Sequence, residues 1–432
     1  MSKSKLQNLH SPKGMHDILP QDQPWWDKIR QEIDYIADYY NFHRIDTVLM
    51  ERAEIFEKSL GETSDIVEKE MFVLKSTSGD RFVLRPEGTA GIVRAYVQHG
   101  LSHLGQPLKL FYLGPMFRKE QPQAGRFRQF HQAGFEIMGG DSDAVYDAQV
   151  ILAIFRLLEN LKIKDISLHI NSIGCRICRP NYRKKLIAYY RPLAAKLCRD
   201  CRNRLKQNPL RLLDCKNEDC QKFKSEAPII LDNLCVSCSR HLKHVLEFLE
   251  ELDLSYVLDN QLVRGLDYYN KTVFEFFTNT VSEDGRKFDF ALASGGRYDY
   301  LMELFGARTN AGVGGAVGLE RLIEVMKAAK VNLSLRKKPG VFFIHIGELA
   351  KKRSLKLIES LRDEGVPVKE SLGKDSLGAQ LRSANKEGSD YTLIFGQKEA
   401  FEESIIIRDL KNGVQETVPL RKLVSEVKKR LK

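Results

Sequence analysis

The chain has 432 residues, of which 43% are hydrophobic and 29% are charged. A chain of this length predicts two to three domains, each able to bury a sizeable core. No run of about 18 apolar residues occurs, and the N-terminus lacks the apolar segment of a secretory signal. The composition therefore argues against a membrane protein and favours a soluble protein of the cytoplasm.

The net charge of +11 is concentrated in one segment. Between Cys175 and Arg240 there are 16 Lys and Arg residues against six Asp and Glu, so this segment carries ten of the eleven surplus positive charges. All eight cysteines also lie in Cys175–Cys238. A basic segment of this kind is typical of contact with a polyanion such as nucleic acid, although a solvated surface can have the same composition.

The first part of the chain alternates between helix and strand patterns. Apolar residues at helical spacing predict a helix over 24–40, and Pro24 suits its first turn. Short alternating or apolar runs predict several strands, and two later runs with helical periodicity predict further helices. The strands are expected over 80–88, 108–114, 166–172, 271–279 and 292–299, and the helices over 241–252 and 318–329.

The pattern changes after the polar stretch 331–340. Strands and helices then alternate at short intervals, which predicts a small α/β domain with a largely parallel sheet. The expected elements are a strand over 341–347, a helix over 350–365, a strand over 366–370, a helix over 376–388 and a strand over 391–396.

Three separated regions combine turn residues with fixed charges. In the first, LRPEGTAGIVRAY (84–96), Pro86 fixes the backbone before Glu87, and Gly88 permits an unusual turn. Glu87 and Thr89 are therefore expected to project into a cleft. A plain surface turn is the alternative interpretation.

The second region, FYLGPMFRKEQPQAGRFRQFHQAGFE (111–136), predicts a strand, a loop and a second strand. Guanidinium groups bind phosphate with two parallel hydrogen bonds, and an aromatic ring can stack on a base. The loop and its flanks therefore suit an anionic, aromatic ligand, although a surface hairpin with scattered charge remains the alternative. The residues concerned are Arg118, Lys119, Glu120, Arg126, Arg128 and Phe130.

The third region consists of LVRGLDYYN (262–270) and GVGGAVGLERL (312–322). Glycines at 312, 314 and 315 permit close approach of a ligand or another backbone, just before a helix that carries Arg321. Neither a GxxxxGK[ST] phosphate loop nor a GxGxxG fingerprint in a βαβ unit is present.

Together these stretches resemble one family. FRKE, with its strand–loop–strand surroundings, resembles motif 2 of the class II aminoacyl-tRNA synthetases, and GVGGAVGLERL resembles their motif 3. The resemblance to the histidyl-tRNA synthetase family is more specific and runs from about Pro12 to the C-terminus. It is carried by PKGMHDILP, SDIVEKEMF, LRPEGTA, RQFHQAGFE, LVRGLDYYN and SGGRYD.

The resemblance implies an α+β fold with a class II catalytic core on an antiparallel sheet. A cysteine-rich insertion would interrupt this core, and a C-terminal α/β anticodon-binding domain would follow it. The expected division is a core over 1–172 and 251–330, a basic insertion over 173–250, a linker over 331–339 and an anticodon-binding domain over 340–432. The implied activity joins L-histidine to tRNA(His) through histidyl-adenylate, with ATP and Mg²⁺.

The resemblance also implies roles at the ATP site. Arg118 and Arg264 would hold the α-phosphate, and Arg321 would hold the γ-phosphate, so these three are the implied catalytic residues. Glu120 would meet the adenine amino group, and Phe130 would stack on the ring. The implied ATP-binding residues are thus Arg118, Glu120, Arg126, Phe130 and Arg321.

At the histidine site, the amino group requires a carboxylate and polar acceptors, and the imidazole requires an acceptor and a hydroxyl. The resemblance implies that Glu136 and Tyr269 bind the imidazole and that Glu87, Thr89 and Gln132 bind the amino group. The implied histidine-binding residues are Glu87, Thr89, Gln132, Glu136, Tyr268 and Tyr269.

The motif 2 loop, around Gln123 and Arg126, would approach the acceptor end of tRNA. Gln121 stands where the family often has arginine, which puts one cationic contact in doubt. The family also implies a homodimer, although Val48 stands where its dimer-interface motif has a proline.

The cysteines have the spacing of metal sites, with three CxxC pairs and one CxxxxC pair. Disulfides are the less expected use of cysteines in a cytosolic chain. The hypothesis is two structural zinc sites, paired either sequentially or interleaved. Loss of zinc is then expected to weaken tRNA charging more than adenylate formation. The expected ligands are Cys175, Cys178, Cys198, Cys201, Cys215, Cys220, Cys235 and Cys238.

Two other functions fit part of the pattern. A zinc-ribbon nucleic-acid protein would explain the cysteines and the charge, but CxxC pairs are more often structural, and these lie between two catalytic blocks. A catalytically silent regulatory or tRNA-binding relative would explain the fold. Such regulatory relatives generally lack the anticodon-binding domain and lose the catalytic motifs, which this chain keeps.

Overall fold

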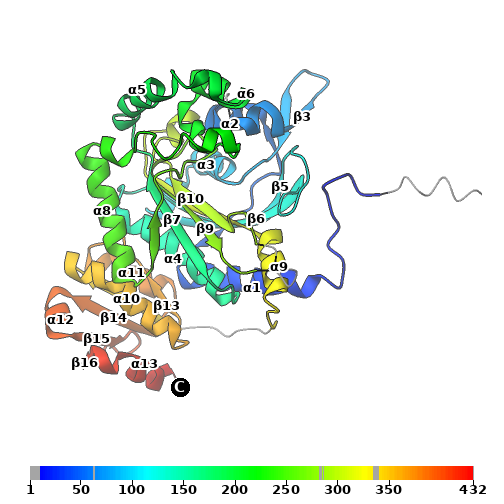
Figure 1. Cartoon of the computed structure of the whole chain (residues 1–432). Coiled ribbons are helices and arrows are strands. Elements are labelled where there is room, and N and C mark those ends of the chain that lie inside the picture. Colours follow the sequence, from blue (N-terminus) through cyan, green and yellow to red (C-terminus); the bar gives the residue numbers. More distant parts are fainter. Residues whose placement is uncertain (1–9, 62–63, 282–284, 286, 334–339, 432) are drawn as a thin grey trace, which may run out of the picture.

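The first 330 residues are built around one eight-stranded sheet in the computed structural model, which describes residues 10–61, 64–281, 285, 287–333 and 340–431 (Figure 1). Its central strands are antiparallel, and only the edge pairs β1–β5 and β7–β8 are parallel. The expected antiparallel core is therefore confirmed. In spatial order the strands are β1 (His43–Arg44), β5 (Leu108–Phe117), β6 (Gln129–Met138), β11 (Gly312–Gly318), β10 (Ala293–Arg297), β9 (Asn270–Thr278), β7 (Ile166–Ser172) and β8 (Tyr256–Leu258).

Three helices form the main hydrophobic core with this sheet: α1 (Gln23–Tyr39), α4 (Ala144–Asn160) and α9 (Leu319–Ala328). The helices predicted over 24–40 and 318–329 are confirmed as α1 and α9. The sequence analysis missed α4, which is buried along nearly its whole length. A helix that is apolar on all sides lacks the single stripe that identifies an amphipathic helix.

A smaller three-stranded antiparallel sheet lies beside the core and consists of β2 (Met50–Arg52), β4 (Arg81–Leu84) and β3 (Phe72–Lys75). The predicted strand over 80–88 is therefore shorter than expected, since β4 ends just before Pro86. Near this sheet lie α2 (Ala53–Leu60), a π-helical turn (Ile66–Glu70), α3 (Thr89–Gln98) and two 3₁₀ turns (Leu101–Leu104 and Met302–Phe305).

The cysteine-rich segment leaves the core after β7 and returns before β8, and it forms a helical unit at the top of Figure 1. It comprises α5 (Cys178–Tyr190), α6 (Arg199–Gln207), α7 (Glu218–Gln221) and 3₁₀ turns at Ala194–Lys196, Pro209–Leu212 and Leu231–Asn233. The chain returns through α8 (Val236–Glu251). This helix begins five residues before the predicted 241, because its first turn carries small and cysteine residues instead of an apolar repeat.

The C-terminal domain is a five-stranded sheet with the order β13-β12-β14-β15-β16. The prediction of a largely parallel sheet is wrong for half of it, since β14–β15 and β15–β16 are antiparallel. Only seven residues join β14 to β15, whereas a parallel crossover needs a dozen or more. The elements are β12 (Val341–Ile346), α10 (Glu348–Asp363), β13 (Val368–Glu370), α11 (Leu377–Lys386), β14 (Tyr391–Gly396), α12 (Gln397–Glu402), β15 (Ser404–Asp409), β16 (Gln415–Pro419), a 3₁₀ turn (Leu420–Lys422) and α13 (Leu423–Leu431).

Helix α8 connects three parts of the molecule. It starts at the cysteine-rich unit, packs against α4 of the core and reaches α10 of the C-terminal domain (Figure 1). Glu247 near its end pairs with Lys352 of α10 at 2.9 Å. Most of the predicted linker, 334–339, lies outside the described residues. No helix in the described ranges combines the length and hydropathy needed to cross a bilayer.

Candidate active site

One pocket opens on the face of the large sheet and is lined by residues from five separated stretches of the chain. Of the twelve residues expected to bind ATP or histidine, Glu136 alone lies behind the pocket wall. Gln123 lies on the exposed loop outside the pocket. The eleven residues that line the pocket are Glu87, Thr89, Arg118, Glu120, Arg126, Phe130, Gln132, Arg264, Tyr268, Tyr269 and Arg321.

One end of the pocket is acidic and buried. The carboxylate of Glu87 accepts hydrogen bonds from the backbone N–H groups of Thr89 at 2.7 Å and Ala90 at 2.9 Å, so it caps the first turn of α3. The hydroxyl of Thr89 in turn donates to Glu136 at 2.7 Å. Burial raises the pKa of both carboxyl groups, and that of Glu136 reaches about 8. Glu136 also accepts a hydrogen bond from the hydroxyl of Tyr298.

Two glycines make room for this acidic end. A Cβ at Gly314 would lie 1.7 Å from Oε2 of Glu136, and a Cβ at Gly88 would lie 2.3 Å from the ring of Tyr112. The prediction of an unusual turn at Gly88 is wrong, because its φ of −96° and ψ of −34° are accessible to any residue. Glycine is required there by the close approach of the tyrosine ring.

A buried polar atom without a protein partner points to a ligand at the same end. Among the described residues, Oε1 of Gln132 is one of the buried side-chain atoms that has no hydrogen-bond partner. A buried, unpaired acceptor costs free energy unless a donor satisfies it. The rings of Tyr268 and Tyr269 lie 4.5 Å apart beside it, both nearly buried.

The remaining lining of the pocket includes four arginines, two of which pair with carboxylates. Arg264 pairs with Glu275 on β9 and donates to the hydroxyl of Ser294 at 2.8 Å, and its guanidinium lies 5.5 Å from the ring centre of Tyr269. Burial opposes the charge of Arg264, but the neighbouring Glu275 carboxylate outweighs this and the pKa of Arg264 is raised. The arginine is therefore permanently charged and held in one orientation.

Arg118 and Arg321 are two others of the four arginines. The guanidinium of Arg118 lies 5.2 Å from the ring centre of Phe130 and donates to the carbonyl of Pro86 at 3.0 Å. Arg321 donates to the carbonyls of Gly125 at 2.8 Å and Ala291 at 2.7 Å. Burial, together with the nearby positive charges, lowers the pKa of Arg321 to about 10. The cluster of positive charges that lowers the pKa of Arg321 suits a polyanion.

The motif 2 loop crosses the mouth of the pocket between β5 and β6. Arg126 donates to Glu120 at 3.3 Å within this loop, and the Arg126 side chain is 41% exposed. Glu120, the expected adenine partner, therefore pairs with Arg126.

The eight cysteines, all free thiols, gather into two groups of four. One group is Cys175, Cys178, Cys235 and Cys238, and the other is Cys198, Cys201, Cys215 and Cys220. Within each group all four sulfur atoms lie within 4.8 Å of one another. The second group is nested inside the chain segment that the first group closes, so the sequential pairing considered above is excluded by the geometry.

Two protein-family models together match nearly the whole chain. The family model described as histidyl-tRNA synthetase matches residues 14–322, and the model described as anticodon binding domain matches residues 340–430. The chain belongs to the histidyl-tRNA synthetase family.

Relatives and solved structures agree with this assignment. The histidine–tRNA ligase of Dehalococcoides mccartyi is 43% identical over 98% of this chain and 99% of its own length. That of Acetivibrio thermocellus is 39% identical over 97% and 99%. The crystal structure of the apo histidyl-tRNA synthetase of Staphylococcus aureus is 30% identical, with a TM-score of 0.61 over 97% of this chain and 99% of that chain.

Sequence reasoning missed the residues that hold the synthetase pocket in shape. Glu275 fixes Arg264, Tyr298 donates a hydrogen bond to Glu136, and the ring of Tyr112 packs against Gly88 and Gly134. A carboxylate in the middle of the apolar strand KTVFEFFTN was an available signal for Glu275. Tyr112 and Tyr298 lie within two of the quoted stretches, FYLGPMFRKE and SGGRYD, but nothing in the local pattern distinguishes a pocket tyrosine from a core tyrosine.

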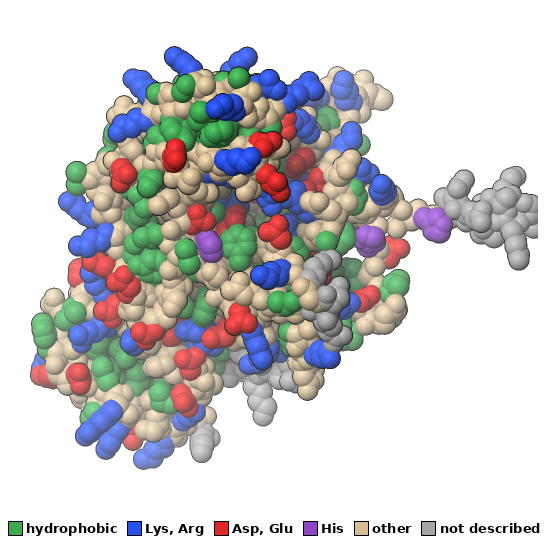
Figure 2. All heavy atoms as spheres, viewed as in Figure 1, with side chains coloured by type: hydrophobic (Ala, Val, Ile, Leu, Met, Phe, Trp, Pro, Cys, Tyr) green, Lys and Arg blue, Asp and Glu red, His purple; other side chains and the backbone are tan. Residues whose placement is uncertain are grey.

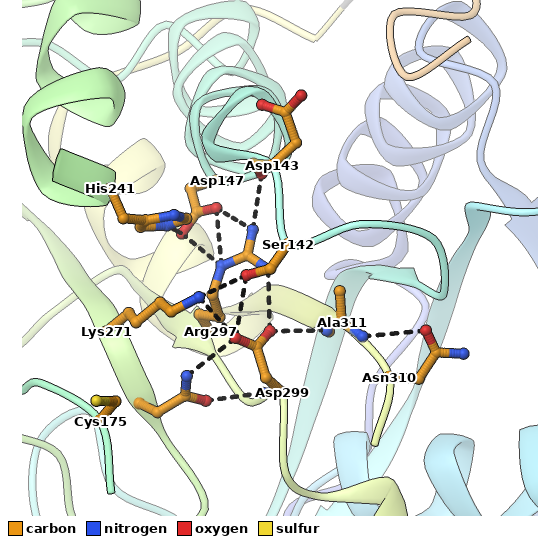
Figure 3. Close-up of polar contacts among 12 residues, drawn as sticks. Ser142, Asp143, Asp147, Cys175, His241, Lys271, Arg297, Asp299, Asn310 and Ala311 are labelled. Carbon is orange, nitrogen blue, oxygen red and sulfur yellow. Dashed lines mark hydrogen bonds and ion pairs between the residues drawn. The ribbon is translucent and has the colours of Figure 1, made fainter. Parts of the chain in front are cut away.

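Behind the sheet, the SGGRYD stretch of the synthetase supplies a buried ion network (Figure 3). Arg297, whose side chain is 1% exposed, pairs with Asp147 of α4 and with Asp299 at 3.0 Å. His241 of α8 lies 3.3 Å from the same Asp147. Burial alone would raise the pKa of Asp147, but Arg297 and His241 outweigh it and hold this pKa well below its usual range.

Proposed function

We infer that the enzyme charges tRNA(His) with L-histidine and that the pocket described above is where histidine meets ATP. The observation that carries this inference is the division of one pocket into a buried acidic end and an end lined by arginines. An amino acid with a positive amino group fits the first, and a triphosphate fits the second.

The reaction has two displacement steps. A carboxylate oxygen of histidine attacks the α-phosphorus of ATP, the bond to the β-phosphate oxygen breaks, and pyrophosphate leaves with histidyl-adenylate formed. A hydroxyl of the terminal adenosine of tRNA then attacks the carbonyl carbon, and AMP leaves. Arg118 and Arg264 are proposed to neutralise the charge that develops at the α-phosphate, and Arg321 to hold the γ-phosphate. Such steps depend on positioning and on fixed charge.

Recognition of histidine is proposed to use the buried end. The amino group would donate to Glu87, Thr89 and the unsatisfied Oε1 of Gln132, and the imidazole would lie between Glu136 and Tyr269. A site of this kind rejects apolar amino acids, because its own buried polar groups would then be left without partners.

ATP is proposed to enter with Mg²⁺. This ion takes oxygen ligands and keeps much of its water shell, so it is held largely by phosphate oxygens. It supplies charge neutralisation on the triphosphate. The adenine is proposed to stack on Phe130 and to meet Glu120 once Arg126 has released it.

Two assays test the activity. Purified enzyme should catalyse histidine-dependent exchange of pyrophosphate into ATP and should then aminoacylate tRNA with histidine. A catalytically silent regulator would support neither reaction. A zinc-ribbon nucleic-acid protein would bind tRNA without exchange activity.

Replacing Glu136 should weaken histidine binding but should relieve the cost of burying an ionised carboxylate at higher pH. Glu136→Ala and Glu136→Gln should both raise the histidine Michaelis constant, by roughly 10-fold, since a buried polar group left without its partner costs about 1–3 kcal/mol. The folded pKa of Glu136, about 8, exceeds the ordinary 4.5. Its carboxyl therefore supports folding below about pH 4.5 and loses that contribution as the pH rises through about 8.

The glutamine variant cannot ionise, so its stability relative to the wild type should grow between these two pH values. Denaturant unfolding at pH 5 and pH 8 measures this difference. An unchanged Michaelis constant would remove Glu136 from the histidine site, and an equal stability difference at both pH values would contradict the buried carboxyl.

We also propose that each cysteine group binds one structural zinc ion. Four sulfurs about 2.3 Å from one zinc ion lie about 3.8 Å apart. The Cys175–Cys178 sulfurs are 3.8 Å apart, and the Cys198–Cys215 sulfurs are 3.9 Å apart. Backbone N–H groups also donate to these sulfurs, as at Cys178, whose sulfur accepts from Cys235 at 3.0 Å.

Metal analysis can test both the number of zinc ions per chain and which cysteines share one ion. The wild type should contain two zinc ions per chain. Cys175→Ser with Cys235→Ser damages a single group and should leave one ion, whereas Cys175→Ser with Cys198→Ser damages both and should leave none. Sequential pairing would give the reverse result, and a wild type without zinc would refute the proposal.

Contacts with tRNA are proposed for three surfaces. Gln123 and Arg126 lie on the loop at the pocket mouth, where the acceptor end must enter. Figure 2 shows Lys and Arg side chains spread over the cysteine-rich unit, where 12 of the 16 between Cys175 and Arg240 are exposed. These suit contact with the phosphate backbone, which positions a nucleic acid without reading its sequence. The C-terminal domain is proposed to bind the anticodon.

We propose that the chain divides into the five parts named in the sequence analysis. We also propose that the enzyme forms a homodimer. Large apolar side chains are exposed beside and on the small sheet, where Val48, Leu49 and Met50 lie near Val73 and Leu74. Large apolar side chains that are exposed on one small sheet are typical of an interaction surface. This surface includes the stretch that resembles the dimer motif of the family.

A further inference from the structure

We propose that the cysteine-rich unit, residues 175–240, holds the catalytic segment Arg264–Tyr269 in its active conformation, with Arg211 and Asn208 as positioning residues for histidine activation. The inference rests on the proposed function of the pocket. It concerns the adenylate step, whereas the exposed basic surface of the same unit concerns tRNA.

The catalytic segment needs support from outside. Residues 259–269 form neither helix nor strand, yet they carry Arg264, Tyr268 and Tyr269. A segment without its own ladder of hydrogen bonds keeps one conformation only where neighbouring elements contact it. The contacts that fix it therefore decide how accurately Arg264 faces the α-phosphate.

Arg211 of the 3₁₀ turn Pro209–Leu212 supplies one such contact. Its guanidinium donates to the backbone carbonyl of Gly265 at 3.1 Å and to Asp65 at 2.7 Å. Arg204 of α6 donates to the same Asp65 carboxylate at 3.1 Å. Asp65 belongs to the 64–72 stretch, so the two arginines tie this stretch to the residue directly after Arg264.

Two further contacts come from the same unit. The side-chain amide of Asn208 donates to Asp267 at 2.8 Å. Arg179 of α5 donates to the backbone carbonyl of Tyr269 and to that of Ile173 at 3.2 Å. Arg179, Asn208 and Arg211 line one small cavity whose other wall includes Arg264 and Asp267. The unit thus contacts the catalytic segment at three successive points.

The two cysteine groups are placed to support these contacts. Arg204, Asn208 and Arg211 all lie in the 13 residues between Cys201 and Cys215, and Arg179 directly follows Cys178. A loop closed at both ends has fewer conformations available to it. Each group of cysteines therefore restricts the segment that carries the contacting side chains.

The basic residues of the cysteine-rich unit fall into a large exposed set and a small set that is not exposed. Of the 16 Lys and Arg residues between Cys175 and Arg240, four are not exposed: Arg179, Arg204, Arg211 and Lys224. Three of these four make the contacts described above. Sequence alone predicted that disturbing this unit would weaken tRNA charging first, whereas these contacts predict a loss already in the adenylate step.

The test compares Arg211→Ala and Asn208→Ala with Arg202→Ala, a matched control at an exposed position on α6. Pyrophosphate exchange should fall in the first two variants, with Arg211→Ala losing roughly 10- to 100-fold in kcat because a small misplacement of a catalytic group is costly. The Michaelis constant for ATP should change little, and Arg211→Lys should recover part of the rate. Arg202→Ala should exchange like the wild type.

Thermal unfolding and metal content are measured on the same preparations, so that a variant that fails to fold is recognised and Asn208→Ala then carries the comparison. If the wild type shows no exchange, the proposed function fails. If the wild type exchanges and both variants match Arg202→Ala, the positioning role is overturned. The positioning role is also overturned if Arg211→Ala and Asn208→Ala lose only the transfer of histidine to tRNA.

Discussion

Replacing Arg264 with alanine should reduce histidine-dependent pyrophosphate exchange by about 100- to 1,000-fold, the loss typical of removing one fixed group that stabilises the transition state. Binding of histidine in the absence of ATP should change far less, because the proposed histidine contacts come from other residues. Exchange kinetics and calorimetric titration of histidine measure the two effects separately. Wild-type exchange in the variant would refute the role of Arg264.

The buried partner of Arg264 requires a control. Arg264→Ala leaves the carboxylate of Glu275 without its cation, and an uncompensated buried charge destabilises the fold. The double variant Arg264→Gln/Glu275→Gln removes both charges and should regain stability while exchange stays low. Recovery of exchange in this double variant would mean that the single variant had lost activity only through misfolding.

Replacing Arg297 with alanine should cost about 3–5 kcal/mol of stability, because Asp147 and Asp299 would be left buried without their common cation. Asp147 has a folded pKa held below its ordinary value, so the ion network contributes stability above about pH 4 and loses it as the pH falls. The deficit of the variant should therefore shrink in acid. Urea unfolding at pH 7 and at about pH 2 measures the change, because the loss begins only below about pH 4.

The matched control is Arg308→Ala, an exposed arginine eleven residues further along the chain. Its effect should stay within about 0.5 kcal/mol, as is usual for exposed positions. A loss at Arg297 no larger than that at Arg308 would contradict the buried network. Arg297 does not line the pocket, so the variant should still bind histidine where it remains folded.

Local patterns predicted the elements whose apolar residues show one clear period. The stripe of Ile29, Ile33 and Ile36 predicted α1, and the alternation in ISLHINS predicted β7. Helix α4 was missed because burial on all sides removes the stripe. Strands β15 and β16 were overlooked although the apolar run III and the Asn412-Gly413 turn after it give a hairpin signal.

The pocket itself could be assembled only through the family resemblance. Glu87, Arg118, Arg264 and Arg321 are up to 234 positions apart, and the sheet order that brings them together depends on pairings that no local pattern records. Cysteine pairing was open for the same reason, since each sulfur has several partners at suitable spacing. Spacing within a CxxC pair is local, whereas pairing between them depends on the tertiary fold.

Helix α8 sets the distance between the cysteine-rich unit and the C-terminal domain. It begins at Cys235 and Cys238 of one thiol group, its His241 reaches the ion network of the core, and apolar residues from it and from α10 share one buried cluster. Its 16 residues span about 24 Å as an unbroken rod. The helix therefore fixes the distance between the cysteine-rich unit, which is proposed to contact the tRNA backbone, and the C-terminal domain, which is proposed to bind the anticodon.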